Sequence, residues 1–113
     1  MKVLFDTNII LDVLLDRQPF SEHASYLLSR VERSEMTGFL CATTVTTIHY
    51  LLSKHLDKGK ANTCIHSIMA LFEVAAVNRL VIENALESRF TDFEDSVLHE
   101  SAIHAGVEYI VSR

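Results

Sequence analysis

Residues 2–20 read KVLFDTNIILDVLLDRQPF and contain a complete strand-to-helix unit. The run from Lys2 to Asp6 is apolar and ends in a polar Asp-Thr-Asn triplet, which is typical of a short buried strand. Apolar residues then recur at helical spacing from Ile9 to Leu15. Pro19 prevents this helix from continuing, because proline lacks the backbone N–H that a helix interior needs. The stretch therefore predicts a strand followed directly by a helix, with Asp6 at the junction.

The rest of the chain continues this alternation. Further helices are predicted from Ser21 to about Ser34, from a Thr43 or Thr44 cap through Leu52, from Ala61 to Phe72, from an Asn78 cap to about Ser88, and from Phe93 to His104. Further strands are predicted over residues 39–42, 73–77 and 109–111, with a basic connection at 54–60 and Gly106 closing the last helix. Strands that alternate with helices predict right-handed crossovers, so we expect an α/β fold with a parallel sheet of about four strands covered on both faces.

Composition limits the class of protein. The chain has 113 residues, of which 49% are hydrophobic, and this suits one globular domain rather than a disordered chain. Lys and Arg number 10 against 15 Asp and Glu, a formal net charge of −5. Such a charge argues against a protein that binds nucleic acid by bulk electrostatics, but not against a nuclease that borrows positive charge from metal ions.

The cysteines and the apolar stretches bear on the compartment. Cys41 and Cys64 are too few and too far apart for a disulfide scaffold, so we expect two buried thiols and a reducing cytoplasm. The longest uncharged stretch, residues 36–53, contains five Thr, and Asp6 interrupts any signal-peptide core. We therefore expect no membrane segment.

Two acidic segments are candidates for chemistry. Asp6 closes the first predicted strand, and functional groups collect at the carboxyl ends of parallel strands, although Asp6 could equally cap the following helix. Residues 92–95 read DFED, in which Asp92 suits the N-cap of the last helix. Asp95 shares a helix face with Leu98 and His99, so we expect it to turn at least partly inward and to need a partner such as Mg²⁺ or Mn²⁺.

Hydroxyl and basic side chains give weaker indications. Residues 43–47 hold four Thr, which capping and back-bonding to carbonyls explain best, although Thr47 could hold a water or phosphate oxygen beside a metal. Lys54 and Lys58 belong to the main basic cluster and could touch phosphates, but a solvated loop is the simpler interpretation. Arg17 could likewise reach a substrate or be a plain surface residue. The His spacings do not form the i, i+4 pair of zinc sites that use two helical histidines.

Three segments in this order resemble a PIN domain, most closely the bacterial PIN domains of the VapC-toxin type. They are the opening KVLFDTNIILDVLLDRQPF, the middle CATTVTTIHYLLSK and the late DFEDSVLHESAIHAGVEYIVSR. The resemblance implies a three-layer α/β/α sandwich and a ribonuclease that depends on Mg²⁺ or Mn²⁺, with acidic residues gathered at the C-terminal edge of the sheet. Carried over by motif, Asp6 is the first metal-binding acid and Asp95 the third, with Asp92 close by and Asn8 as the polar residue beside the first acid.

Two departures from the PIN pattern modify this expectation. Thr47 stands where the family usually has an acid, and the sequence ends at Arg113, before a further polar position, strand and tail. We therefore expect a single PIN-like domain over residues 1–113 that lacks the family's C-terminal strand, and one weakly held metal ion rather than two. The partners that the resemblance implies are an RNA substrate and a small antitoxin protein, and the high apolarity of so small a domain suggests a second copy in a homodimer.

Two alternatives remain open at this point. The chain could be a catalytically impaired PIN-like domain that binds protein or RNA, as Thr47 and the early end would suggest. It could also be an enzyme that accepts a phosphoryl group on Asp6. Asn8 argues against the second alternative, because the dehalogenase pattern needs a second Asp at that position.

Overall fold

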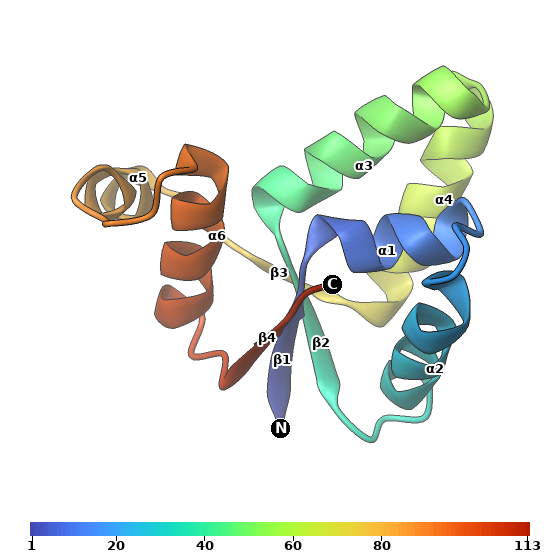
Figure 1. Ribbon diagram of the computed structural model, residues 1–113, viewed down its shortest axis with the longest axis horizontal. Helices are drawn as coiled ribbons and strands as arrows, with labels where there is room; N and C mark the ends of the chain where they lie inside the picture. Colours follow the sequence, from blue (N-terminus) through green and yellow to red (C-terminus); the bar gives the residue numbers. More distant parts are fainter.

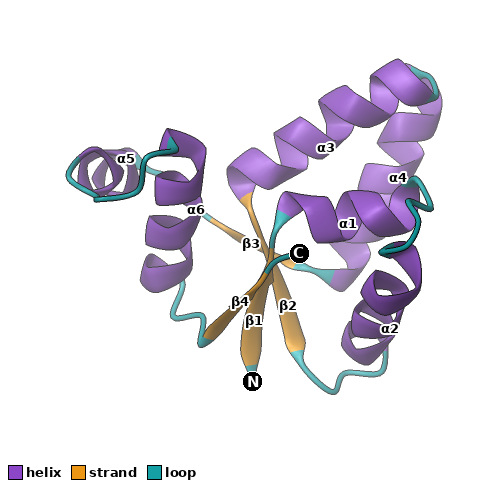
Figure 2. Ribbon diagram, in the orientation of Figure 1, coloured by secondary structure: helices purple, strands orange, loops and turns teal.

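The computed structural model describes residues 1–113 and confirms the alternation of strands and helices. Its elements are β1 (Lys2–Phe5), α1 (Thr7–Leu14), α2 (Ser21–Glu32), β2 (Thr37–Cys41), α3 (Ala42–His55), α4 (Lys58–Leu71), β3 (Glu73–Ala75), α5 (Arg79–Leu86), α6 (Phe93–His104) and β4 (Tyr109–Val111). Figure 2 shows the strands converging at the centre with helices on either side. The predicted α/β class is therefore correct.

All four strands are parallel and lie in the order β3-β2-β1-β4. In the register, Leu4 of β1 lies beside Phe39 of β2 and Ile110 of β4. Val3, Leu4 and Phe5 are all buried, as expected for a strand that is covered on both faces of a parallel sheet. β1 therefore lies inside the sheet, and its carboxyl end leads directly into Asp6.

The helices form a layer on each face of the sheet. Figure 1 shows α1 to α4 on one face and α5 with α6 on the other. The side chains of β1 alternate accordingly: Val3 and Phe5 enter the larger core, and Leu4 enters the smaller one. This is the three-layer α/β/α sandwich that the resemblance implied.

Several predicted boundaries were wrong. The basic connection over residues 54–60 does not exist as a loop, because α3 continues to His55 and α4 begins at Lys58. Asp57 is the missed N-cap of α4, and its carboxylate accepts a hydrogen bond from the Lys60 amide at 2.8 Å. Two residues therefore suffice to reverse the chain between these helices.

The predicted helix starts at the threonines and at Ser21 were also displaced. Cys41 occupies the N-cap position of α3, so the threonines lie inside the first turns, and Ser21 is already helical in α2. The third strand ends at Ala75 rather than Val77. Cys41 is buried as expected, whereas Cys64 is only half-buried, and both are free thiols. No helix is long and apolar enough to cross a membrane.

Two glycines fix local geometry. Gly106 has φ +73°, the left-handed conformation predicted for the residue that closes the last helix. The amides of Gly106 and Val107 donate to the carbonyls of Ile103 and Ala102, which satisfies the open end of α6. Gly38 in β2 lets the Phe72 ring approach closely, because a Cβ at Gly38 would lie 2.6 Å from Phe72 Cε1.

Candidate active site

Asp6 stands at the junction of β1 and α1, where its backbone is fixed by the sheet. Its amide donates to the Val111 carbonyl of β4 at 2.9 Å. It occupies the N-cap position of α1, but its side chain makes no capping hydrogen bond. The capping interpretation of Asp6 is therefore wrong for its side chain, and the half-buried carboxylate faces a cavity instead.

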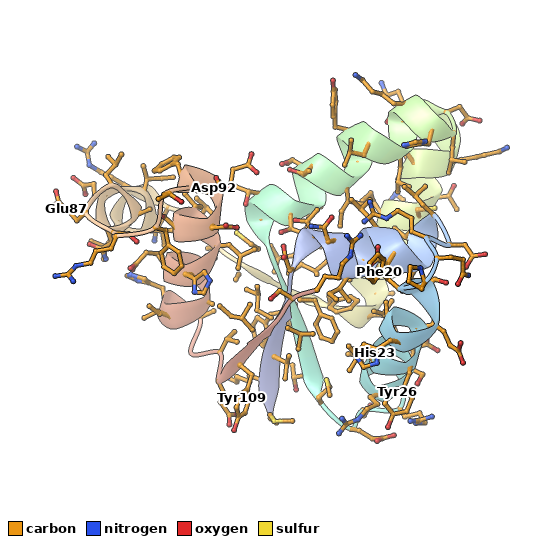
Figure 3. All side chains as sticks on the ribbon, viewed as in Figure 1. Phe20, His23, Tyr26, Glu87, Asp92 and Tyr109 are labelled. Atoms are coloured by element: carbon orange, nitrogen blue, oxygen red, sulfur yellow. The ribbon has the colours of Figure 1, made fainter.

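The cavity brings together all five side chains that the sequence singled out for catalysis. It has a volume of about 430 Å³ and lies at the carboxyl edge of the sheet, where α1, α3 and α6 begin. Its lining residues are Asp6, Thr7, Asn8, Leu11, Thr43, Thr44, Thr47, Leu51, Asp92, Glu94, Asp95 and Leu98. Figure 3 labels Asp92 at the start of α6. Segments that lie more than 80 residues apart in sequence thus meet in one acidic site.

The electrostatics of Asp6 reflect this crowding. Burial raises the pKa of Asp6 above its ordinary value of 3.8, although the Thr7 backbone amide opposes the change. The negative charge of Asp95 raises the pKa further, whereas His99 and Arg113 lower it. Because burial and Asp95 disfavour the ionised form, the Asp6 carboxylate would gain from a bound cation.

The DFED segment supplies a cap and an exposed acid. Asp92 is the N-cap of α6, as predicted, and its Oδ1 accepts a hydrogen bond from the Glu94 amide at 3.0 Å. Asp95 is exposed to solvent at the cavity wall, so the expectation that it turns inward was wrong. The buried face of the helix begins at Ser96 instead. Glu94, which was not among the predicted site residues, also lines the cavity.

The threonines of α3 form the hydroxyl-bearing side of the cavity. The Thr7 hydroxyl donates to Thr44 Oγ1 at 3.0 Å, which joins the starts of α1 and α3. Thr46 bonds back to the Thr43 carbonyl at 2.9 Å, as predicted for this run. Thr47 is half-buried and lines the cavity on the same side. Its hydroxyl therefore lies in the same space as the carboxylates.

Asn8 and Arg17 belong to a second polar cluster that sequence reasoning missed. Arg17 Nη2 donates to the Asn8 carbonyl at 3.2 Å and to Asn8 Oδ1 at 3.3 Å. Asp12, which has no exposed surface, lies 2.9 Å from Arg17 Nε. Arg17 is therefore not a plain surface residue, because it is held between Asp12 and the cavity-lining Asn8.

Arg113 completes this cluster from the other end of the chain. Its Nη2 and Nε donate to the two carboxylate oxygens of Asp12 at 2.7 and 3.2 Å. This hydrogen bonding holds the pKa of Asp12 below its ordinary value of 3.8 and raises the pKa of Arg113. An acid within the apolar run of the first helix was the only sequence signal for the cluster.

The predicted basic residues of α3 and α4 lie outside the cavity lining. Lys54 is exposed, and its ammonium lies 4.7 Å from the centre of the Tyr50 ring. Lys58 is the exposed first residue of α4. Neither side chain lines the cavity, so a role for them in RNA binding stays a prediction.

The donor set of the cavity fits a hard divalent cation. Its polar groups are carboxylate, hydroxyl and amide oxygens, which Mg²⁺ and Mn²⁺ prefer. No three His, Cys, Asp or Glu side chains of the chain converge on one point as a ready-made metal site. A divalent ion held here would therefore need water or substrate oxygens to complete its coordination.

Comparison with known proteins identifies the family. The PIN domain family matches residues 2–113. The chain belongs to the PIN domain family. It is 26% identical over 116 residues to Ribonuclease VapC1 of Aquifex aeolicus (strain VF5), and the match covers 98% of this chain and 80% of that protein.

Solved structures share the fold of this PIN domain at lower identity. The Mycobacterium tuberculosis toxin VapC20, described as cleaving the sarcin-ricin loop, has a TM-score of 0.75 at 15% identity, covering 98% of this chain and 88% of its own. A toxin–antitoxin complex from Klebsiella pneumoniae has a TM-score of 0.72 at 17% identity, and the match covers 98% of this chain and 86% of that chain. VapBC2 from Rickettsia felis has a TM-score of 0.68 at 13% identity, and the match covers 100% of this chain and 88% of that chain.

Proposed function

We propose that this PIN domain is an endoribonuclease that depends on a divalent metal ion and acts as the toxin of a toxin–antitoxin pair. The observation that carries the proposal is that Asp6, Asp92 and Asp95 all line one cavity at the carboxyl edge of the sheet. Membership of the PIN family and the similarity to Ribonuclease VapC1 support the choice of RNA as substrate.

Asp6 and Asp95 are the residues that would hold Mg²⁺ or Mn²⁺. Asp92 would help through a water or through Oδ2, because its Oδ1 already accepts the hydrogen bond that caps α6. A bound ion would supply Lewis-acid stabilisation of the phosphate and an activated water. With Thr47 in place of a further acid, the donor set favours one ion over two.

The remaining residues of the cavity prepare the site. Asn8 and Thr47 offer an amide and a hydroxyl that can orient a water or a phosphate oxygen. Leu11, Leu51 and Leu98 also line the cavity, and apolar walls lower the local dielectric and strengthen charge interactions within it. Lys54 and Lys58 remain candidates for contacts with more distant RNA phosphates.

The partner we propose is a small antitoxin protein. Two of the solved structures that share this fold are VapBC2 bound to promoter DNA and a toxin–antitoxin complex. The chain would act in the cytoplasm, where its two free thiols would remain reduced. A homodimer is the oligomer we expect for the toxin.

Cleavage of RNA by the purified chain tests the proposal. We expect cleavage in Mg²⁺ or Mn²⁺ that EDTA abolishes, and a loss of at least about 100-fold in Asp6→Asn and Asp95→Asn. The matched control is Glu87→Gln, an exposed acid at the end of α5 that lies away from Asp92 (Figure 3). Unchanged cleavage in Asp6→Asn would show that the assignment of Asp6 is wrong.

The same assay separates the alternative function. A chain that binds RNA but does not cleave it in either metal would behave as a catalytically impaired binding module. The convergence of the carboxylates argues against this outcome, because a binding module for RNA gains nothing from a cluster of negative charge.

A further inference from the structure

The cluster around Asp12 holds more positive charge than its buried carboxylate needs. Asp12 is fully buried and contacts the guanidinium groups of both Arg17 and Arg113, at distances of 2.7 to 3.2 Å. One arginine would neutralise it. One carboxylate and two guanidinium groups leave a net charge of +1 at this place.

Both guanidinium groups are held in place. Arg113 lies 4.0 Å above the centre of the Phe20 ring while it binds both oxygens of Asp12. Arg17 is fixed between Asp12 and the backbone and side chain of Asn8. Side chains that are already ordered lose little rotamer entropy when they bind a ligand.

Each guanidinium group also keeps donors for a ligand. The protein contacts of Arg17 use Nε and Nη2, and the hydrogen bonds of Arg113 use the same two nitrogens, so Nη1 of each remains available. The Arg17 and Arg113 side chains are 35% and 34% exposed. Planar guanidinium donors that face solvent are well suited to phosphate oxygens.

The pair lies at the rim of the acidic cavity. Arg17 contacts Asn8, which lines the cavity, and Arg113 follows two residues after Val111, whose carbonyl binds the Asp6 amide. A separate groove of about 360 Å³ runs beside Arg113 and is lined in part by Phe20, which precedes α2, and by His23 of α2, both labelled in Figure 3. Arg113 therefore borders open space of its own, while its charge also acts on Asp6 of the cavity.

We infer that Arg17 and Arg113, positioned by Asp12, bind an RNA phosphate next to the one that lies in the acidic cavity. The inference rests on the proposed function, because the ligand is the backbone of the RNA substrate. The carboxylates of the cavity repel a polyanion, so phosphates outside the reach of a metal ion need a fixed positive charge. Arg17 and Arg113 place that charge directly beside the cavity.

A surface cluster of the same composition provides the control. Glu35 contacts Arg30 and Arg33, so it too is one carboxylate between two arginines. All three side chains are at least 32% exposed, and none lines the cavity or the groove beside Arg113. Arg33→Gln therefore removes the same charge from an exposed cluster of the same composition away from the site.

The test is the salt dependence of RNA binding. The full chain with Asp95→Asn, which prevents cleavage, is titrated with a short single-stranded RNA in Mg²⁺ at a series of salt concentrations. We expect Arg17→Gln and Arg113→Gln each to reduce the slope of log K against log salt by about 0.7, the value for one lost phosphate contact on a single strand. The ratio of the RNA-binding constant of the parent to that of each variant would then fall about 2.6-fold between about 50 and 200 mM salt.

Further variants and probes keep the outcomes distinct. Arg113→Lys retains the charge and should recover most of the slope, even if Arg113→Gln lowers the melting temperature. Slopes of Arg17→Gln and Arg113→Gln that equal those of the parent and of Arg33→Gln would overturn the inference while leaving the nuclease proposal intact. The inference would also be overturned, in favour of an acidic protein ligand, by one other result. In that result Arg17→Gln and Arg113→Gln lose the binding of a poly-glutamate probe that the parent shows, while their salt slope for RNA binding stays unchanged. A parent chain that neither binds nor cleaves RNA would refute both proposals.

Discussion

The buried carboxylate of Asp12 offers the sharpest test of how this fold is held together. Asp12→Asn keeps the shape of the side chain but removes the charge, so two guanidinium groups face a neutral amide. Removing one partner of a buried ion pair typically costs about 3–5 kcal/mol. Arg17 and Arg113 are about one-third exposed and can turn toward water, which lowers the cost. We therefore expect a loss of about 2 kcal/mol in the free energy of unfolding.

Urea unfolding followed by circular dichroism measures this loss. The surface counterpart Glu35→Gln should leave the unfolding curve unchanged, although Glu35 also contacts two arginines. The effect of Asp12→Asn should also depend on pH. Because the folded pKa of Asp12 lies below 3.8, its ionised form stabilises the fold above that pH, and this contribution is lost as the pH falls through the folded pKa.

Two results would refute this reasoning. The first is an Asp12→Asn protein whose stability at pH 7 lies within about 0.5 kcal/mol of the parent, which is the range of ordinary surface substitutions. The second is a stability difference that stays constant as the pH is lowered below 3.8. Either result would mean that the two arginines find equivalent partners without the carboxylate.

Three further substitutions have defined outcomes. Asp6→Asn should raise the melting temperature at pH 7 while abolishing cleavage. The pKa of Asp6 is raised in the folded state, so ionisation of its carboxylate costs stability as the pH rises. The gain in melting temperature should therefore vanish well below pH 3.8, where the carboxyl group is protonated in both states. Gly38→Ala should cost about 1–3 kcal/mol in urea unfolding, because the new Cβ would lie 2.6 Å from Phe72 Cε1, and combining it with Phe72→Leu should recover part of the loss. Gly106→Ala should cost about 1 kcal/mol by the same measurement, from backbone strain at φ +73° alone, because its Cβ would have no neighbour within 4 Å.

The individual acids of the cavity were predictable because the signals for each of them are local. Asp6 follows an apolar strand, and the carboxyl ends of parallel strands share one edge of the sheet. Asp92 opens a helix with a recognisable cap, and the helix brings Asp95 to the same edge. The alternation of short strands and amphipathic helices predicted the parallel sheet with helices on both faces, and the resemblance predicted the three-layer sandwich. These patterns made each acid a candidate, and the resemblance to PIN domains predicted that they gather at one edge of the sheet.

What the sequence did not predict depends on contacts between distant residues. Asp12 lies on an apolar helix where a carboxylate is unexpected, and its main partner Arg113 lies 101 residues away. No periodicity connects these two positions. The direction of Asp95 was misjudged for a related reason: its helical neighbour Leu98 reaches the core, but Asp95 lies one turn earlier, where the same face opens onto the cavity.

The formal net charge of −5 illustrates why overall charge is a poor guide to this site. Four acids, Asp6, Asp92, Glu94 and Asp95, line one cavity, while two arginines are fixed at its rim by a single buried carboxylate. In such an arrangement, affinity for RNA depends on where each charge is held rather than on the sum. A divalent ion that neutralises the cavity would remove the repulsion that opposes Arg17 and Arg113. We therefore expect binding of a nuclease-resistant RNA analogue to the parent chain to strengthen when Mg²⁺ is added at constant ionic strength, and to strengthen less in Asp6→Asn and in Asp95→Asn.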